Sequence, residues 1–270
     1  MNIKTKIKHV ISYIKKKEKI PIYISKETTE LFKGKTVLIS GGSGGIGRAI
    51  ANKMKLCGAN VIISGVNEKK LKKISEEIGN ITYVILDIRS INSITNVINS
   101  LNGQIDILIN CAGINNGDSF FDVKEETFDN IYNINVKGTY FLSQIIAKRM
   151  IENNIKGHIL NVSSASALRP ASTPYAISKW AIDGMTKGLA DILIPYGITV
   201  NAIGPGPTAT EMLNMSQNDE ISHEKSPIGR YATPEEIANL AVFMVSNMGD
   251  LIVGDTFYIS GGSGVISLHR

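Results

Sequence analysis

The sequence predicts an α/β protein built on a single, doubly wound parallel sheet with helices on both faces. Short apolar segments rich in β-branched residues alternate with helix-length amphipathic segments, which is typical of βαβ units. A glycine cluster lies directly between the first predicted strand and the first predicted helix. The chain has 270 residues, of which 43% are hydrophobic, enough for the core of one large domain.

The strands are expected at 36–40, 61–64, 83–86, 105–109, 159–163, 198–203 and 256–259. Helical segments are expected over 46–56, 68–78 and near 91–101, between the first four strands. Crossover connections between parallel strands are right-handed, so this alternation indicates a doubly wound sheet with helices on both faces.

Residues 1–33 differ from the rest and are predicted to be a basic N-terminal extension to a domain spanning 34–270. They carry nine Lys and three Glu, a charge of +6, so the remaining 237 residues sum to −1. Ile3, Ile7 and Val10 recur at helical spacing among lysines, which suits an anionic membrane surface, a partner, or packing on the body or a neighbouring subunit. Pro21 ends any helix there.

Composition excludes several classes of function. Residues 34–270 are nearly neutral, so they carry no broad basic surface of the kind that binds nucleic acid. No apolar run approaches the roughly 18 residues that span a bilayer. Cys57 and Cys111 lie far apart and fit no disulfide or metal spacing, so we expect no metal site and a reduced, cytoplasmic setting.

The glycine cluster reads Ser40-Gly41-Gly42-Ser43-Gly44-Gly45-Ile46-Gly47. Glycines permit a tight turn and let the backbone approach a pyrophosphate, while the following helix presents free N–H groups to that anion. Because the cluster follows a strand and opens a helix, it favours nucleotide binding in a Rossmann-type fold over a purely structural turn.

The spacing of Gly41, Gly45 and Gly47 resembles the T-G-x-x-x-G-x-G signature of the short-chain dehydrogenase/reductase family, with Ser40 in place of Thr. The resemblance extends from about residue 34 to 262. It includes Asn110-Cys111-Ala112-Gly113, like N-N-A-G with Cys for the second Asn, and Tyr175-Ala176-Ile177-Ser178-Lys179, which matches Y-x-x-x-K. Further matches are Asn135, the strand end Asn161 to Ser164, the stretch 201–212 (NAIGPGPTATEM), residues 227–236 and Ser260-Gly261-Gly262.

This resemblance implies an NAD(P)-dependent oxidoreductase that moves a hydride between nicotinamide and a carbonyl or secondary alcohol. It also implies a small-molecule substrate and a homotetramer or dimer. The residues expected to bind the cofactor are Gly41, Ser43, Gly44, Gly45, Ile46, Gly47, Asn67, Asp87, Ile88, Asn110, Ala112, Gly113, Tyr175, Lys179, Pro205, Gly206, Thr208 and Thr210.

Hydride transfer also requires a proton at the substrate oxygen. A free Tyr, with a pKa of about 10, is a poor base at neutral pH, but a nearby ammonium favours its phenolate. Tyr175 and Lys179 are four residues apart and share one helix face, so Tyr175 is the predicted acid/base. Ser164 is the predicted substrate-orienting hydroxyl, with Ser163 as the alternative, and the resemblance implies that Asn135 holds a water that relays protons to Lys179.

The end of the second strand leaves the choice between NAD and NADP open. The stretch 64–67 reads SGVN and has neither the acid that repels a 2′-phosphate nor the Arg that binds one. With Arg48, Lys69 and Lys70 nearby, the missing acid tilts the prediction slightly toward NADP.

The sequence does not specify the substrate. An acyl-carrier thioester needs cations for an acidic partner, yet 190–197 (ADILIPYG) offers Asp191 and no cation, while Arg169 and Lys156 keep this alternative open. A sugar or polyol dehydrogenase is a second enzymatic alternative. A non-catalytic dinucleotide-binding scaffold is the distant non-enzyme alternative, disfavoured because both Tyr175 and Lys179 are present.

Overall fold

The fold is a three-layer α/β/α sandwich in a computed structural model, which describes residues 28–117, 119–213, 221–224 and 226–266. Seven parallel strands form one sheet in the order β3-β2-β1-β4-β5-β6-β7. The strands are β1 (Thr36–Ser40), β2 (Asn60–Gly65), β3 (Thr82–Ile85), β4 (Ile107–Asn110), β5 (His158–Val162), β6 (Thr199–Pro205) and β7 (Thr256–Ile259). The predicted doubly wound sheet is confirmed, and the predicted strands differ from these bounds by at most a few residues.

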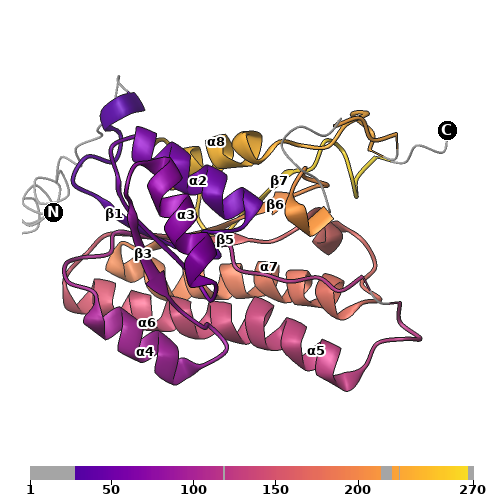
Figure 1. The fold of residues 1–270 in the computed structure, drawn as a ribbon, viewed down its shortest axis with the longest axis horizontal. Coiled ribbons are helices and arrows are strands. Elements are labelled where there is room, and N and C mark those ends of the chain that lie inside the picture. Colours follow the sequence, from indigo (N-terminus) through magenta and orange to yellow (C-terminus); the bar gives the residue numbers. More distant parts are fainter. Residues whose placement is uncertain (1–27, 118, 214–220, 225, 267–270) are drawn as a thin grey trace, which may run out of the picture.

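Helices cover both faces of the sheet, as Figure 1 shows: α2, α3 and α8 lie on one side, and α4, α5, α6 and α7 on the other. Their bounds are α2 (Gly45–Leu56), α3 (Glu68–Ile78), α4 (Ile91–Ser100), α5 (Glu125–Tyr132), α6 (Thr139–Glu152), α7 (Pro174–Leu193) and α8 (Pro234–Met244). The short helical turns are η1 (Thr28–Glu30), the π-helical η2 (Asn133–Gly138), η3 (Ala165–Leu168), η4 (Ile194–Tyr196), η5 (Glu211–Leu213) and η6 (Asn247–Gly249).

Two apolar cores hold these layers together. One includes Ile39, Ile50 and Ile237 and joins the sheet to α2 and α8, while the other includes Leu108 and Ile146 and joins it to α4, α6 and α7. Both faces of the sheet are covered, so strands β4 and β6 are buried along almost their whole length.

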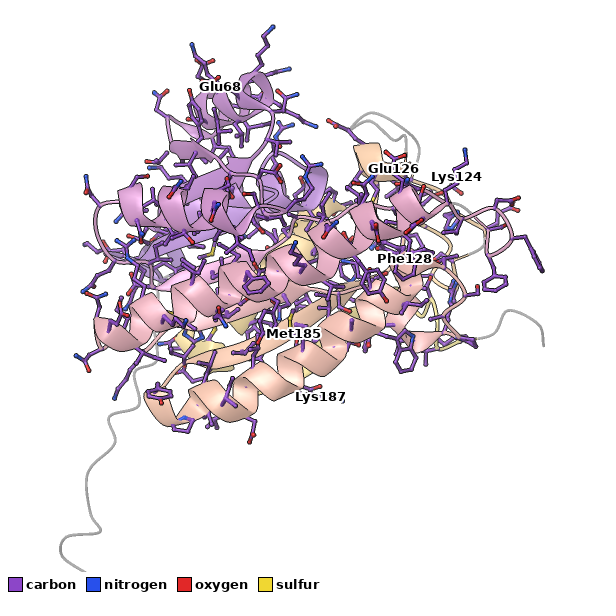
Figure 2. All side chains as sticks on the ribbon, turned by 90° about the horizontal axis from the view of Figure 1, so that it is seen from below. Glu68, Lys124, Glu126, Phe128, Met185 and Lys187 are labelled. Atoms are coloured by element: carbon purple, nitrogen blue, oxygen red, sulfur yellow. The ribbon has the colours of Figure 1, made fainter. Side chains whose placement is uncertain are left out.

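Helices α5 and α6 form one nearly continuous rod through η2, and this rod runs beside α7 (Figure 2). The π-helical turn contains Asn135 and Gly138. A Cβ at Gly138 would lie 2.8 Å from Cγ1 of Ile88, so the absence of a side chain lets this rod approach the end of β3 closely. Single π turns inside helices often occur at functional sites.

The predicted extension lies largely outside the described residues, which begin at Thr28. Phe32, within the predicted extension, is only 3% exposed, packs in the core beside α2, and donates its N–H to the oxygen of Cys57 at 2.9 Å. The folded body therefore reaches back at least to Phe32. No helix among the described residues is both long and apolar enough to cross a membrane.

Candidate active site

One cavity of about 690 Å³ opens along the carboxyl ends of the strands. The strand order reverses between β1 and β4, and parallel α/β sheets bind ligands at such a point. Most of the predicted site residues line this cavity: Gly41, Ser43, Gly44, Gly45, Ile46, Gly47, Asp87, Ile88, Ala112, Gly113, Ser164, Tyr175, Lys179, Pro205, Gly206, Thr208 and Thr210. The topology thus brings together residues that are up to 169 positions apart in the sequence.

The glycine loop is shaped for close backbone approach. Gly41 has φ +68°, which favours glycine, and a Cβ there would lie 2.7 Å from Cα of Ala112. A Cβ at Gly47 would lie 2.3 Å from the oxygen of Gly41. Gly44 precedes α2 without a side-chain cap, so N–H groups of the first helical turn remain available to an anion. This cradle fits the pyrophosphate of a dinucleotide.

Tyr175 and Lys179 lie in the first turns of α7. This helix starts sharply, because Thr173 accepts from the N–H of Ala176 at 3.2 Å and Pro174 occupies the first turn. Lys179 is only 6% exposed, and its Nζ donates to the main-chain oxygen of Val162 at 2.9 Å. The same Nζ lies 5.5 Å from the centroid of the Tyr175 ring. The ammonium is thus held beside the phenol at the end of β5.

The two serines that follow β5 have different partners. The Ser163 hydroxyl donates to the main-chain oxygen of Lys179 at 3.3 Å, which ties the strand end to α7. The Ser164 hydroxyl accepts from the N–H of Ser166 at 3.1 Å and lies 3.2 Å from the Ser166 hydroxyl. Both serines line the cavity, and Ser164 is the one whose hydroxyl is not bonded to α7.

Three predicted site residues are not among those that line the cavity. Asn135 is 1% exposed; its amide oxygen accepts from the N–H of Ile114 at 2.9 Å, and its nitrogen donates to the Ile114 oxygen and the Ser178 hydroxyl at 3.1 and 3.0 Å. It therefore supports the backbone beside Gly113. A Cβ on that glycine would lie 3.4 Å from Asn135 Oδ1 and 3.6 Å from Lys179 Nζ.

Asn110 and Asn67 are the other two. Asn110 is 3% exposed, and its side-chain nitrogen donates to Ser143 at 2.8 Å and to Asn161 at 2.9 Å, so it joins β4 to α6 and β5. Asn67 caps α3 by accepting from the N–H of Lys70 at 3.0 Å. Short polar side chains at strand ends and helix starts can serve either purpose, and the sequence pattern does not distinguish them.

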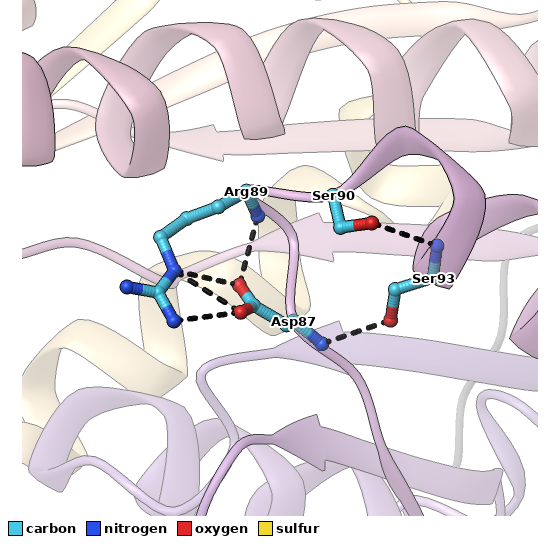
Figure 3. A network of polar contacts seen from close by, with 4 residues as sticks. All are labelled: Asp87, Arg89, Ser90 and Ser93. Atoms are coloured by element: carbon cyan, nitrogen blue, oxygen red, sulfur yellow. Dashed lines mark hydrogen bonds and ion pairs between the residues drawn. The ribbon is translucent and has the colours of Figure 1, made fainter.

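Arg89, which was not predicted, lines the cavity at the end of β3 (Figure 3). Its guanidinium holds the Asp87 carboxylate in a bidentate pair, with Nη2–Oδ2 and Nε–Oδ1 distances of 2.7 and 2.9 Å. These hydrogen bonds hold the pKa of Asp87 below its usual value. Ser90 caps α4, and Ser93 accepts from the N–H of Asp87 at 3.3 Å, so the loop is fixed at both ends.

The segment after β6 crosses the cavity toward the glycine loop. Thr208 donates from its hydroxyl to the oxygen of Gly206 at 2.9 Å and is 4% exposed. A Cβ at Gly45 would lie 2.6 Å from Cγ2 of Thr210, so this segment contacts the start of α2. Glu211, Met212 and Leu213 continue it along the cavity, and residues 214–220 and 225 lie outside the described residues.

Two of the three cations expected near a 2′-phosphate, Arg48 and Lys70, are held in ion pairs. Arg48 pairs with Glu77 at 3.1 Å, and Lys70 pairs with Glu211 at 2.5 Å. Arg48, Lys69 and Lys70 are not among the cavity-lining residues, whereas Ser64, Gly65 and Val66 at the end of β2 are. The described residues also contain no cluster of three His, Cys, Asp or Glu suited to a metal ion.

A family model described as enoyl-(acyl carrier protein) reductase matches residues 41–264. The chain also covers 99% of a solved short chain dehydrogenase/reductase family protein over 87% of its own length, with 32% identity and a TM-score of 0.80. The chain belongs to the short-chain dehydrogenase/reductase family. The resemblance drawn from the glycine loop and the Tyr-x-x-x-Lys motif is therefore confirmed.

Curated relatives of the family match at similar extent. The chain is 38% identical over 235 residues to the 3-oxoacyl-[acyl-carrier-protein] reductase FabG of Rickettsia felis, covering 85% of this chain and 96% of the relative. It is 34% identical over 242 residues to FabG of Aquifex aeolicus, covering 85% and 97%. The solved 3-ketoacyl-(acyl-carrier-protein) reductase of Brucella melitensis, complexed with NADH, shows 29% identity, a TM-score of 0.79 and coverage of 86% and 99%.

This short-chain dehydrogenase/reductase is a nicotinamide-dependent oxidoreductase acting on carbonyl or CH–OH groups. The nicotinamide, when bound, supplies or accepts the hydride. The glycine loop, Tyr175, Lys179 and Ser164 all line the same cavity.

Proposed function

We propose that the enzyme reduces the 3-oxo group of an acyl thioester, with Tyr175 as the proton donor. The observation that carries the chemistry is the pairing of Tyr175 with the buried Lys179 on the wall of a cavity that also contains the glycine cradle. Reduction of a carbonyl adds a hydride at carbon and a proton at oxygen, so a proton donor beside the cofactor site completes the reaction.

Each of the four predicted catalytic residues has a distinct task in this proposal. Tyr175 donates its phenolic proton to the carbonyl oxygen and regains it from solvent through Lys179. Lys179 stabilises the phenolate that forms, and Ser164 orients the carbonyl by a hydrogen bond to its oxygen. Asn135 acts as a positioning residue, because it holds Ile114 and Ser178, which flank Gly113 and Lys179.

The lining of the substrate end of the cavity is suited to an acyl chain. Ile114, Met212 and Leu213 give it apolar walls. Arg169, which is exposed at the rim, is the cation that an acidic carrier or a phosphate-bearing arm would meet. None of the ion pairs between described residues involves Arg169. The named activities of the FabG relatives agree with this substrate class.

We also propose NADP as the slightly preferred cofactor, with NAD accepted. Support comes from the end of β2, where Ser64, Gly65 and Val66 line the cavity and carry no acid to repel a 2′-phosphate. In this proposal, the predicted cofactor-binding residues that line the cavity are the ones that bind the cofactor.

The proposed assembly is a cytoplasmic homodimer or homotetramer. Phe128 of α5 lies on the outer side of the layer formed by α5, α6 and α7 (Figure 2) and stacks on Tyr132, and Tyr140 of α6 and Trp180 of α7 are also exposed. Exposed aromatic clusters of this kind mark protein contacts. Light scattering of the full chain tests this assembly, and a monomer mass would refute it.

The test of function is the initial rate of NADPH oxidation with an acetoacetyl thioester as substrate. The same rate is measured with an acetoacetate ester and with ketoses. Polyols are tested in the reverse direction, with NADP⁺ as the oxidant. We expect the thioester to give the highest kcat/KM, and Tyr175→Phe to abolish turnover. A higher kcat/KM for a sugar or polyol would replace the acyl substrate with that class. Binding of NADPH without turnover of any substrate would favour the non-catalytic scaffold.

A further inference from the structure

An ion pair joins two distant parts of the chain at the rim of the cofactor cavity. Lys70, in the first turn of α3, lies with Nζ 2.5 Å from Oε2 of Glu211 in η5, 141 residues away in the sequence. Glu211 lines the cavity, so Lys70 meets its partner at the cavity wall.

Lys70 is held near the end of β2. Two residues separate helix α3 from this strand, whose terminal Ser64 and Gly65 line the cavity. Asn67 fixes the helix start by its hydrogen bond to the N–H of Lys70. The positive end of the helix dipole favours an anion at this place, and no acid stands at the end of β2 to oppose one.

The three cations around this end of the cavity differ in how firmly they are paired. Arg89 is held by two oxygens of Asp87, only two residues away, through several hydrogen bonds. Arg48 pairs with Glu77, and neither lines the cavity. Lys70 is held by a single contact to Glu211, whose side chain is 74% exposed, and an ion pair of such exposure is weak.

We propose that Lys70 is the cofactor-selecting residue of this enzyme, and that it exchanges the Glu211 carboxylate for the 2′-phosphate of NADPH. A phosphate carries more charge than a carboxylate and offers more acceptor oxygens, so it displaces a weakly held carboxylate from an ammonium. With NADH, the Lys70–Glu211 pair stays intact. This inference deepens the cofactor preference proposed above and rests on it.

The exchange has a consequence for the substrate end of the cavity. Glu211 belongs to the same short turn as Met212 and Leu213, and it follows Thr210, which contacts the start of α2. Release of Glu211 from Lys70 removes the ion pair that links this segment to α3. NADPH, unlike NADH, therefore loosens the segment that forms the apolar wall of the substrate site.

The test is direct titration of the full-length protein with NADH and NADPH by nicotinamide fluorescence, independent of turnover. Lys70→Met is expected to raise the Kd for NADPH roughly tenfold, the loss of one charged hydrogen bond, with less than about a twofold change for NADH. Glu211→Gln is expected to lower the Kd for NADPH about two- to fivefold by removing the competing carboxylate.

The double variant and a matched control complete the design. In Lys70→Met, the additional Glu211→Gln change should no longer improve NADPH binding, because the exchanged ammonium is gone. Lys73→Met, one turn further along α3 and 75% exposed, makes the same charge change away from the cavity and should leave both constants unchanged. Equal weakening of NADH and NADPH binding by Lys70→Met would overturn the proposal, and so would the absence of any effect on the Kd for NADPH. NADH binding by the variant shows that its cofactor site is intact.

Discussion

Lys179 lies one turn after Tyr175 on α7, with its Nζ 5.5 Å from the centroid of the Tyr175 ring and 2.9 Å from the main-chain oxygen of Val162. The carbonyl at the end of β5 thus fixes the ammonium beside the phenol before any ligand binds. A charge held in place by the fold needs no reorganisation during the reaction, which makes it effective in stabilising a phenolate.

Tyr175→Phe tests this arrangement by removing only the hydroxyl. We expect kcat to fall by about 10²- to 10⁴-fold, since a positioned proton donor contributes about that much. The Kd for NADPH, measured by fluorescence, should change little because the ring remains. Tyr196→Phe, at a position 54% exposed in η4, is the control and should leave kcat unchanged. A fully active Tyr175→Phe enzyme would exclude the proposed acid.

Asn135→Ala should lower the free energy of unfolding by roughly 1–3 kcal/mol, because Ile114 and Ser178 lose buried hydrogen-bond partners. Urea denaturation measures this change. Asn96→Ala, at an exposed position on α4, is the matched control and should not destabilise the protein. If the two variants unfold alike, the supporting role assigned to Asn135 is wrong.

Gly47→Ala should prevent the glycine loop from keeping its shape, because the added Cβ would lie 2.3 Å from the oxygen of Gly41. We expect a lower Tm and no further rise of Tm when NADH is added, since binding to the folded state is what raises it. Gly184→Ala, where a Cβ meets nothing within 4 Å on the exposed side of α7, should stabilise the helix by up to about 1 kcal/mol. Normal cofactor stabilisation of Gly47→Ala would contradict the cradle.

The Arg230–Glu236 pair before α8 predicts a pH dependence of stability. Hydrogen bonds from Arg230, and from the N–H of Thr233, lower the pKa of Glu236 to about 2. A carboxyl group whose pKa is lower in the folded protein stabilises it above the unfolded pKa, near 4.3, and this contribution is lost as the pH falls toward about 2.

Glu236→Gln isolates this charge, because Gln can still accept from Thr233 and preserve the capping box. We expect a lower Tm than wild type at pH 7 and a difference that shrinks between pH 4 and pH 2. Thermal melts across this range measure it. A constant difference at all pH values would show that packing, and not the charge, is responsible.

The two cysteines should be unreactive in the folded protein. Burial raises the pKa of Cys111 to about 12 although nearby Lys179 opposes the shift, and burial also raises the pKa of Cys57. Since the thiolate is the reactive form, Ellman's reagent at pH 8 should label neither thiol in native buffer and both in denaturant. Rapid native labelling would mean that Cys111, which lines the cavity, is accessible as a thiolate.

Much of the fold could be predicted because its signals are local. Apolar strand segments alternate with amphipathic helices, and β-branched runs such as Val61 to Ile63 are buried on both faces of the sheet. The glycine loop and Tyr175–Lys179 are also local, since each depends on spacing within one turn or one helix. The sequence therefore predicted which segments bring chemistry to the carboxyl ends of the strands.

Asn110 and Asn135, two predicted site residues that do not line the cavity, are held by contacts between distant segments. Asn67 accepts from the N–H of Lys70 as the cap of α3, and the side-chain nitrogens of Asn110 and Asn135 donate to buried partners on other elements. Strand ends place side chains within reach of the cavity, but packing decides whether a polar group faces the cavity or the backbone behind it.

By itself, the sequence determined the family, the parallel sheet, the glycine cradle and the Tyr175–Lys179 pair, since each is encoded by periodicity or by spacing over a few residues. The tertiary structure alone decided one charge pairing at the rim of the cofactor cavity. Lys70 pairs with Glu211 from 141 residues away, whereas Arg89 pairs with Asp87 only two residues away. Ion pairs form between whichever opposite charges the fold brings within a few ångströms, and no local pattern records that distance.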